Sequence, residues 1–368
     1  MAYAFHALIA FLASYVWESQ RFDRKASSVS LFLLFVILLI LPALQLEVGA
    51  DYSSYLETAK GNHNISIYYQ KGEYLYYTIF SIVKENLPAH SFFVIAYLIN
   101  TALIVNALIK LKAQGYSAYI IVFLFLTTFG LYQNQMNIIR TYTAVFCFIN
   151  AALCRSEDKN LKAIVFSLIG IISHQTYIFA IILLILPKKL LHILQQYPLR
   201  FYLFSFVATA FLATPYILGP LINSLFPFYN HYLSKEIFEP ADIINIATKA
   251  YYIPLNLIFL YLLQKEPSPV PKNQRYFVGL WILTSGIYLG LLTAPVIFFR
   301  AWHYIAFFHL LPIYYILTDK RTRQLAPFVV IYVIAPFLIK VIGFPVGEYH
   351  YKTILGPICT FPWGEPQC

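Results

Sequence analysis

Charged residues are scarce in this 368-residue sequence. Asp, Glu, Lys and Arg make up 11% of it, against about 25% in ordinary soluble domains. Cysteine is also rare, with four in the chain, and no phosphate-binding loop, zinc signature or Gly-x-Ser-x-Gly turn is present. So few charges cannot cover a water-facing surface of normal size. The composition therefore excludes an ordinary soluble protein, and the sequence gives no sign of the nucleotide-binding, zinc or serine-hydrolase classes.

Apolar residues fill the sequence instead. They account for 60% of it, aromatic residues for 18%, and the mean hydropathy is +0.66. This composition predicts an all-α, polytopic membrane protein with about 12 transmembrane helices. Several of the apolar segments are shorter than the roughly 20 residues that a span requires. The predicted spans cover residues 3–19, 29–46, 91–109, 117–131, 134–154, 161–173, 175–187, 201–219, 250–264, 277–294, 300–318 and 325–343.

The connections between these segments alternate between two kinds. One kind is rich in Tyr, His, Asp and Glu, and the other is basic. Basic loops remain in the cytoplasm, so the other loops, and most chemically interesting residues, lie on the outer face. The net charge of +10 therefore reports topology, and no nucleic-acid partner is expected. The basic loops contain Arg21, Arg24, Lys25, Lys110, Lys112, Arg155, Lys159, Lys162, Lys188, Lys189, Arg200, Lys265, Lys272, Arg275, Lys320, Arg321 and Arg323.

The chain is predicted to form a single transmembrane domain over residues 1–368, with no internal repeat. Two outer loops are long, at about 47–90 and 220–249, and long connections are usually functional or disordered. The first contains an apolar run at 74–83 that is too short to span, which predicts a partly helical segment lying at the membrane interface.

Two carboxylates in the first outer loop are flanked by tyrosines. Asp51 precedes Tyr52 and Tyr55, and Glu73 is followed by another tyrosine. A carboxylate accepts hydrogen bonds from sugar hydroxyls, and a tyrosine ring stacks on a pyranose face. The pattern therefore suggests a sugar-binding site, although a solvated loop anchored by interfacial tyrosines fits it equally well.

Two arginines are predicted at the outer, N-terminal ends of spans: Arg140, about two turns into its span, and Arg300. A helix N-terminus favours anions, and an arginine adds a two-pronged donor suited to a diphosphate. The alternative is that each side chain extends to lipid headgroups. Two arginines at the same depth make that alternative less attractive, because buried arginine is costly.

Two histidines are candidate proton carriers. His174 lies in a short outer turn, and His303 lies one helical turn from Arg300. A lone histidine at an interface is more often a structural hydrogen-bonding group. His6 and His309 lie inside apolar segments and are predicted to be core residues.

The four cysteines fall into two pairs. Cys147 and Cys154 lie in an apolar segment and resemble small apolar residues. Cys359 and Cys368 share an outer C-terminal tail, where the environment is oxidising, and are predicted to form a disulfide.

The order of several short motifs is similar to that of the EpsG family of bacterial exopolysaccharide proteins. It begins with Gly49-x-Asp51-Tyr52-x-x-Tyr55, continues with Glu73 and Arg140, and ends with His174. This stretch covers about residues 47–180. The paired Arg-x(10)-Gly motifs of some related Wzy polymerases are absent.

The resemblance implies a GT-C-like polymerase or ligase fold in the bacterial inner membrane, with the active face periplasmic or extracellular. It implies a Wzy-type polymerase that joins repeat units carried on undecaprenyl diphosphate. Asp51, Glu73 or His174 would supply the base, and Arg140, Arg300 and His303 would bind the diphosphate. No metal or cofactor is expected; expected partners are the lipid-linked units, membrane lipids and a chain-length regulator membrane protein.

Three other functions are open. An O-antigen ligase would use the same residues but usually has a larger outer domain. A flippase or transporter would place charges near the middle of the membrane. A membrane O-acyltransferase would need a histidine deep in an apolar run, for which His309 is the candidate.

Overall fold

The protein is described here from a computed structural model. The structure describes residues 2–355 except residues 20, 22, 213, 226–249, 266–267, 288–294 and 344–346. Over these residues the chain is helical and has no β-strand, apart from one isolated bridge between Gln45 and Thr353. The prediction of an all-α protein is therefore confirmed.

The helices group into two compact units, and each is described by itself. One comprises Met1–Ile181 with Pro327–Cys368, and the other comprises Ile182–Ala326. The single transmembrane domain expected from the sequence stays a prediction. The first unit contains α1 (Ala2–Glu18), α2 (Arg24–Ala43), α3 (Tyr52–Lys60), α4 (Ser66–Gln70), α5 (Tyr74–Asn86), α6 (Ser91–Ala113), α7 (Ala118–Thr127), α8 (Leu131–Asn134), α9 (Ile139–Ser156), α10 (Asn160–Ser173), η1 (Gln175–Tyr177), most of α21 (Ala326–Leu338), η7 (Ile339–Gly343) and η8 (Gly347–Tyr349).

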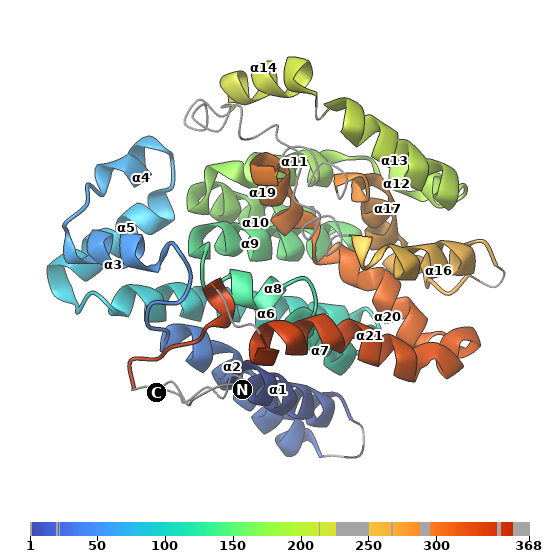
Figure 1. The fold of residues 1–368 in the computed structure, drawn as a ribbon, viewed down its shortest axis with the longest axis horizontal. Helices are drawn as coiled ribbons and strands as arrows, with labels where there is room; N and C mark the ends of the chain where they lie inside the picture. Colours follow the sequence, from blue (N-terminus) through green and yellow to red (C-terminus); the bar gives the residue numbers. More distant parts are fainter. Residues whose placement is uncertain are drawn as a thin grey trace. The chain divides into compact units, whose positions relative to one another are not determined.

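Helices α1 and α2 form an antiparallel hairpin at the N-terminal end of the first unit (Figure 1). Asp23 caps α2, because its carboxylate accepts a hydrogen bond of 2.6 Å from the Ala26 amide. The Ser27 hydroxyl donates to the carbonyl of Trp17 at 2.9 Å, which ties the start of α2 to the end of α1. The hairpin packs through α1 on α7 and through α2 on α6.

The core of this unit lies around α9, which packs against α6 and α10. Almost every side chain of α9 is buried, including Cys147 and Cys154, as predicted. Helix α10 approaches the following turn closely at Gly170, where an added Cβ would lie 2.2 Å from the ring of Tyr177. Only glycine permits this contact, and it fixes the chain immediately before and after His174.

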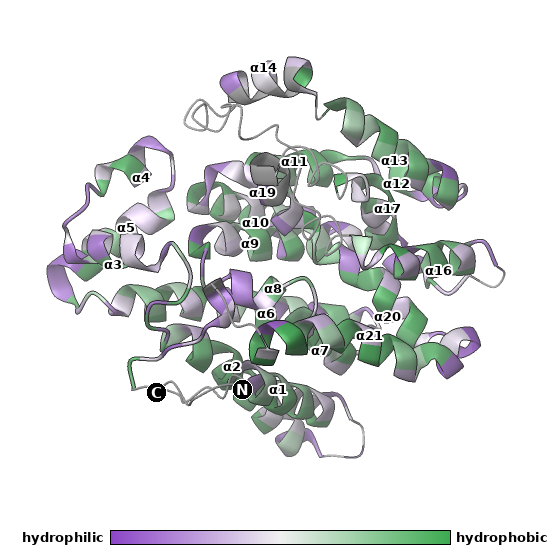
Figure 2. Ribbon diagram, viewed as in Figure 1, coloured by the Kyte–Doolittle hydropathy of each residue, from purple (hydrophilic) through white to green (hydrophobic). Residues whose placement is uncertain are grey.

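Residues 47–90, predicted to form the first outer loop, contain three short helices, α3, α4 and α5, which pack on one another, on α6 and on α10. The predicted helical segment at 74–83 is confirmed as part of α5. This part of the chain contains several hydrophilic stretches, whereas α7, and α2 beyond its first two turns, are mostly apolar (Figure 2). This segment is thus an ordered helical subregion that contacts the core.

A segment near the C-terminal end, residues 352–354, forms backbone hydrogen bonds with residues 44–46, just before this loop. The Leu46 amide donates to the carbonyl of Lys352 at 2.9 Å, and the Ile354 amide donates to that of Leu44 at 3.0 Å. The Lys352 ammonium also lies 2.8 Å from the carboxylate of Glu47. The loop is therefore held at its start by residues from the opposite end of the sequence.

The second unit is also built from helices. In it α12 and α13 pack on α17, and α16 packs on α20. The predicted outer loop at 220–249 lies mostly outside the described residues. The unit contains α12 (Lys188–Leu194), α13 (Pro198–Leu212), α14 (Pro215–Leu225), α16 (Ile253–Leu263), η4 (Lys272–Gln274), α17 (Arg275–Thr284), α19 (Pro295–Ile305), η5 (Phe308–Leu310), α20 (Leu311–Thr318) and η6 (Lys320–Leu325), and α11 (Ile178–Ile185) leads into it.

Within the described ranges, three helices are long and apolar enough to cross a membrane: Arg24–Ala43, Ser91–Ala113 and Lys320–Gly343. A pair bent by 77°, Gln175–Ile185 with Lys188–Leu194, is a fourth if it counts as one span. The chain is therefore a membrane protein. The twelve spans and the GT-C-like class stay predictions, because the other apolar helices found are shorter than a bilayer requires.

Candidate functional site

Three predicted site residues from separate segments meet in one cluster. Glu73 directly precedes α5, Arg140 is the second residue of α9, and His174 directly follows α10. Nη1 of Arg140 donates to Oε2 of Glu73, and Nδ1 of His174 lies 2.7 Å from Oε1 of the same carboxylate. Glu73 is thus the centre of the cluster, with a cation on one side and an imidazole on the other.

Burial makes these contacts strong. The Glu73 side chain is 0% exposed, that of His174 3% and that of Arg140 20%. Burial alone would raise the pKa of Glu73, but the charges of Arg140 and His174 outweigh it and lower that pKa from 4.5 to about 2. The carboxylate is therefore ionised at neutral pH.

Two tyrosine rings complete the surroundings of Arg140. The guanidinium carbon lies 4.8 Å from the ring centroid of Tyr68 and 5.7 Å from that of Tyr55. These distances are within the range of cation–π attraction. The guanidinium is thus fixed by one carboxylate and two rings, which reduces the entropy it would lose on binding a ligand.

The position of Arg140 differs from the one predicted. The expected span 134–154 is interrupted, because α8 ends at Asn134 and α9 begins at Ile139. Arg140 therefore lies in the first turn of α9 and not two turns inside a helix. Its charge adds to the positive end of the helix dipole, and its Nε is buried without a hydrogen-bond partner among the described residues.

The motif around Asp51 is brought to the same helix start. The Asp51 amide donates to Oδ1 of Asn137 at 3.0 Å. Gly49 has a φ of +80°, and an added Cβ there would lie 2.9 Å from Cβ of Asn137, so only glycine fits. Asp51 itself is half-buried. Asn137 was not predicted as a site residue, although it stands three residues before Arg140.

A series of buried side-chain hydrogen bonds lies next to the cluster. The Tyr76 and Thr143 hydroxyls lie 2.5 Å apart, and Thr143 donates to Oδ1 of Asn100 at 2.6 Å. Tyr76 and Thr143 each lie three residues after a member of the ion pair, on α5 and α9. These hydrogen bonds therefore fix the position of α5 along α9, and with it the contact between Glu73 and Arg140.

Tyr52 and Tyr55 do not lie as a sugar-binding surface would. Both are buried, and their rings stack on Phe93 at 4.6 Å and on Phe92 at 5.4 Å. The expectation that they stack on sugars is therefore corrected: they pack α3 against α6.

Exposed tyrosines occur elsewhere in this loop, on both sides of Glu73. Tyr69 is 57% exposed and Tyr74 is 46% exposed, with ring centroids 5.2 Å apart. Tyr77 extends the group, with its ring 5.4 Å from that of Tyr69. Tyr74 is the tyrosine that the sequence pattern placed after Glu73, whereas Tyr69 was not predicted; its place on the other side of the Lys71-Gly72 turn was the available signal.

The remaining predicted residues are not part of this cluster. Arg300 and His303 lie on α19 of the second unit, three residues apart as expected. Arg300 is the sixth residue of α19, so it lies in the middle of the helix and not at its N-terminal end. His303 is buried, and Arg300 is half-buried. Their predicted cooperation with Arg140 stays a prediction.

Two further predictions concern a histidine and the cysteines. His309 is buried as expected, with its ring centroid 4.8 Å from that of Trp302. Cys359 and Cys368 lie outside the described residues, so their disulfide stays a prediction. Among the residues that are described, no group of three or more His, Cys, Asp and Glu side chains could hold a metal ion.

The fold and the cluster define a helical membrane protein with a buried Glu–Arg–His site beside an ordered polar loop. The chain belongs to the EpsG family, whose model matches residues 28–353. EpsG is a Wzy-like polymerase family, so the resemblance predicted from the sequence is confirmed and extends over most of the chain. No curated protein and no solved structure matches the chain.

Proposed function

We propose that this protein is a glycosyltransferase that polymerises oligosaccharide repeat units carried on undecaprenyl diphosphate at the outer face of the bacterial inner membrane. The family gives the class of reaction. The observation that carries the proposal is Arg140, whose side chain is one-fifth exposed and is held at the start of α9 by a fully buried Glu73. A fixed, partly accessible arginine at a helix N-terminus is suited to a diphosphate.

The reaction joins a hydroxyl of one unit to the anomeric carbon of another. The new C–O bond forms as the bond from that carbon to the diphosphate breaks, and the electron pair leaves with undecaprenyl diphosphate. The hydroxyl proton passes to a base on the protein. Negative charge grows on the departing diphosphate, so Arg140 binds the transition state more strongly than the substrate.

Glu73 and His174 act as positioning residues in this scheme. Glu73 is a poor base, because its pKa is lowered to about 2 and its side chain is completely buried. His174 is almost as buried, and its Nδ1 faces Glu73. Together they hold Arg140 in one orientation.

Asp51 is the base that remains among the three candidates. It is half-buried, so it is more accessible than Glu73 or His174. The bond from its amide to Asn137 places it near the start of α9, where Arg140 also lies. We therefore assign proton acceptance to Asp51.

The proposal includes further contacts with the substrate and with partners. Tyr69 and Tyr74 take the role of sugar-stacking rings, because they are exposed and lie on both sides of Glu73. The contact of Arg300 and His303 with the diphosphate stays a prediction from the sequence. A chain-length regulator membrane protein and membrane lipids are the partners.

Deletion of the gene tests the proposal in cells. A polymerase deletion leaves surface polysaccharide with a single repeat unit and no ladder of lengths on a gel. Complementation with wild-type protein restores the ladder, and complementation with Arg140→Ala does not. Loss of all surface glycan would indicate a flippase, and a ladder without acetyl groups would indicate an acyltransferase; either result contradicts the proposal.

A further inference from the structure

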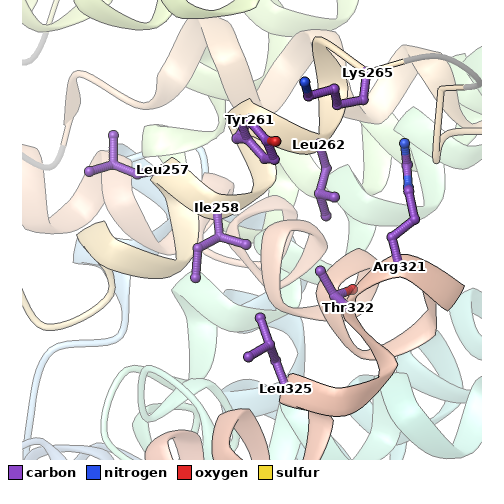
Figure 3. Close-up of a pocket in the computed structure, with 8 residues that line it drawn as sticks. All are labelled: Leu257, Ile258, Tyr261, Leu262, Lys265, Arg321, Thr322 and Leu325. Atoms are coloured by element: carbon purple, nitrogen blue, oxygen red, sulfur yellow. The ribbon is translucent and has the colours of Figure 1, made fainter.

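A groove of about 740 Å3 lies between α16 and η6 in the second unit (Figure 3). Its two ends differ in chemistry. The side chains of Leu257, Ile258 and Leu325 line one end, whereas Lys265 and Arg321 stand at the other. The groove is therefore amphipathic along its length.

The apolar end is open to the surroundings. Leu257 and Leu325 are exposed, as is the ring of Tyr261 between the two ends. Exposed apolar side chains gathered around a concave surface indicate a place where an apolar chain binds. A small soluble anion would gain nothing from this half of the groove.

The basic end carries an excess of positive charge. Lys265 and Arg321 face the groove, and Lys320 and Arg323 are exposed on the same short helix, η6. The neighbouring Asp319 neutralises part of this charge, since its oxygens accept bonds of 2.6 and 3.0 Å from the Arg321 guanidinium. The sequence places all of these residues in loops predicted to be cytoplasmic.

We infer that this groove binds one anionic phospholipid, with its phosphate between Lys265 and Arg321 and an acyl chain along Leu257, Ile258 and Leu325. Arginine and lysine near a membrane surface attract anionic headgroups, and arginine also offers paired donors to phosphate. A zwitterionic headgroup cancels most of this attraction. The inference stands apart from the polymerase proposal, because no residue of the Glu73 cluster takes part.

Native mass spectrometry of the purified full-length protein tests it. The protein is delipidated in detergent and titrated with phosphatidylglycerol or with phosphatidylcholine of the same acyl chains. We expect one phosphatidylglycerol to be retained in preference to phosphatidylcholine. Each of Lys265→Ala and Arg321→Ala weakens its binding about fivefold, and the double variant about 25-fold.

A matched control has the same loss of charge away from the groove. Lys272→Ala combined with Arg200→Ala removes one lysine and one arginine, both exposed, from the same unit, and leaves lipid affinity unchanged. A gain of affinity guards against misfolding: Asp319→Asn keeps the side-chain acceptor that caps η6 but removes the competing charge, so it tightens binding about fivefold. Equal weakening in both double variants, equal retention of the two lipids, or no gain with Asp319→Asn would overturn the inference.

Discussion

Nδ1 of His174 lies 2.7 Å from Oε1 of Glu73, and both side chains are buried. The carboxylate therefore orients the imidazole in the same way that it orients the guanidinium of Arg140 on its other oxygen. One ionised group thus determines the positions of two others that come from different helices.

Substitution of Arg140 distinguishes two roles for its side chain, binding of a diphosphate and anchoring to lipid headgroups. We expect Arg140→Lys to lose turnover almost as severely as Arg140→Ala, by roughly 10²–10³, because lysine keeps the charge but loses the planar pair of donors. Purified protein with lipid-linked repeat units, assayed for chain length on gels, measures this. Arg200→Lys, at an exposed position outside the cluster, is the control. Wild-type ladders from Arg140→Lys would favour headgroup anchoring.

Loss of the central carboxylate should destabilise the fold. Glu73→Gln leaves Arg140 buried beside a neutral amide, and breaking a buried ion pair costs about 3–5 kcal/mol. Thermal unfolding in detergent measures the loss. The matched control is Glu57→Gln, since Glu57 pairs with Lys60 in an exposed position and contributes little. Equal melting temperatures for the two variants would refute the central role of Glu73.

The same ion pair predicts a dependence of stability on pH. Because the pKa of Glu73 is lowered from 4.5 to about 2 in the folded protein, its contribution is complete above pH 4.5 and is lost as the pH falls towards 2. The difference in stability between wild type and Glu73→Gln should therefore shrink as the pH falls from 4.5 towards 2. A difference that stays constant down to pH 3 would contradict the lowered pKa.

Asp51 should be the residue whose loss responds to the solvent base. Asp51→Asn keeps the hydrogen bond from the backbone amide of residue 51 to Asn137 but removes the proton acceptor. We therefore expect turnover to fall by about 10²–10⁴ with little change in KM. Raised pH or an added small carboxylate should restore part of the rate. His174→Gln, at a positioning residue, should respond to neither treatment. Rescue of the His174 variant instead would transfer the role of the base to that histidine.

The exposed tyrosines should affect substrate binding more than chemistry. Tyr69→Ala combined with Tyr74→Ala removes both rings and should raise KM about thirtyfold, because stacking on a sugar face contributes roughly 1 kcal/mol per ring. Phenylalanine at both positions should restore most of the affinity. Tyr52→Phe, in the buried packing of α3, serves as the control. A wild-type KM for the alanine double variant would remove these rings from the site.

The sequence predicted the local features of the fold well and the longer ones less well. The apolar run before Val83 correctly indicated a short helix, and the small side chains of Cys147 and Cys154 correctly indicated burial. The polar run around Gln135 was included in a span, although polar side chains there favour a break between α8 and α9. A hydropathy average over a long window does not detect such a short break. The number of spans therefore cannot be determined from the sequence pattern alone.

The sequence also identified the members of the cluster without their contacts. Glu73, Arg140 and His174 are far apart in the chain, and only the packing of α5, α9 and α10 brings them together. The error at Tyr52 and Tyr55 was avoidable: these residues are three apart, as on one face of a helix, and that face is the buried one. Loop tyrosines were interpreted as exposed because the helix α3 was not anticipated.

The pairing of Leu46 with Lys352 has a consequence for biogenesis. The segment that leads to Gly49 and Asp51 is hydrogen-bonded to residues synthesised about three hundred positions later. These contacts can form only when the later residues have reached the same side of the membrane. A nascent chain that has inserted its first helices therefore contains Glu73 and Arg140, but the segment before Asp51 still lacks its contacts with Lys352. The position of Asp51 would then be fixed only at the end of synthesis, after the segments that carry Glu73 and Arg140 have been made.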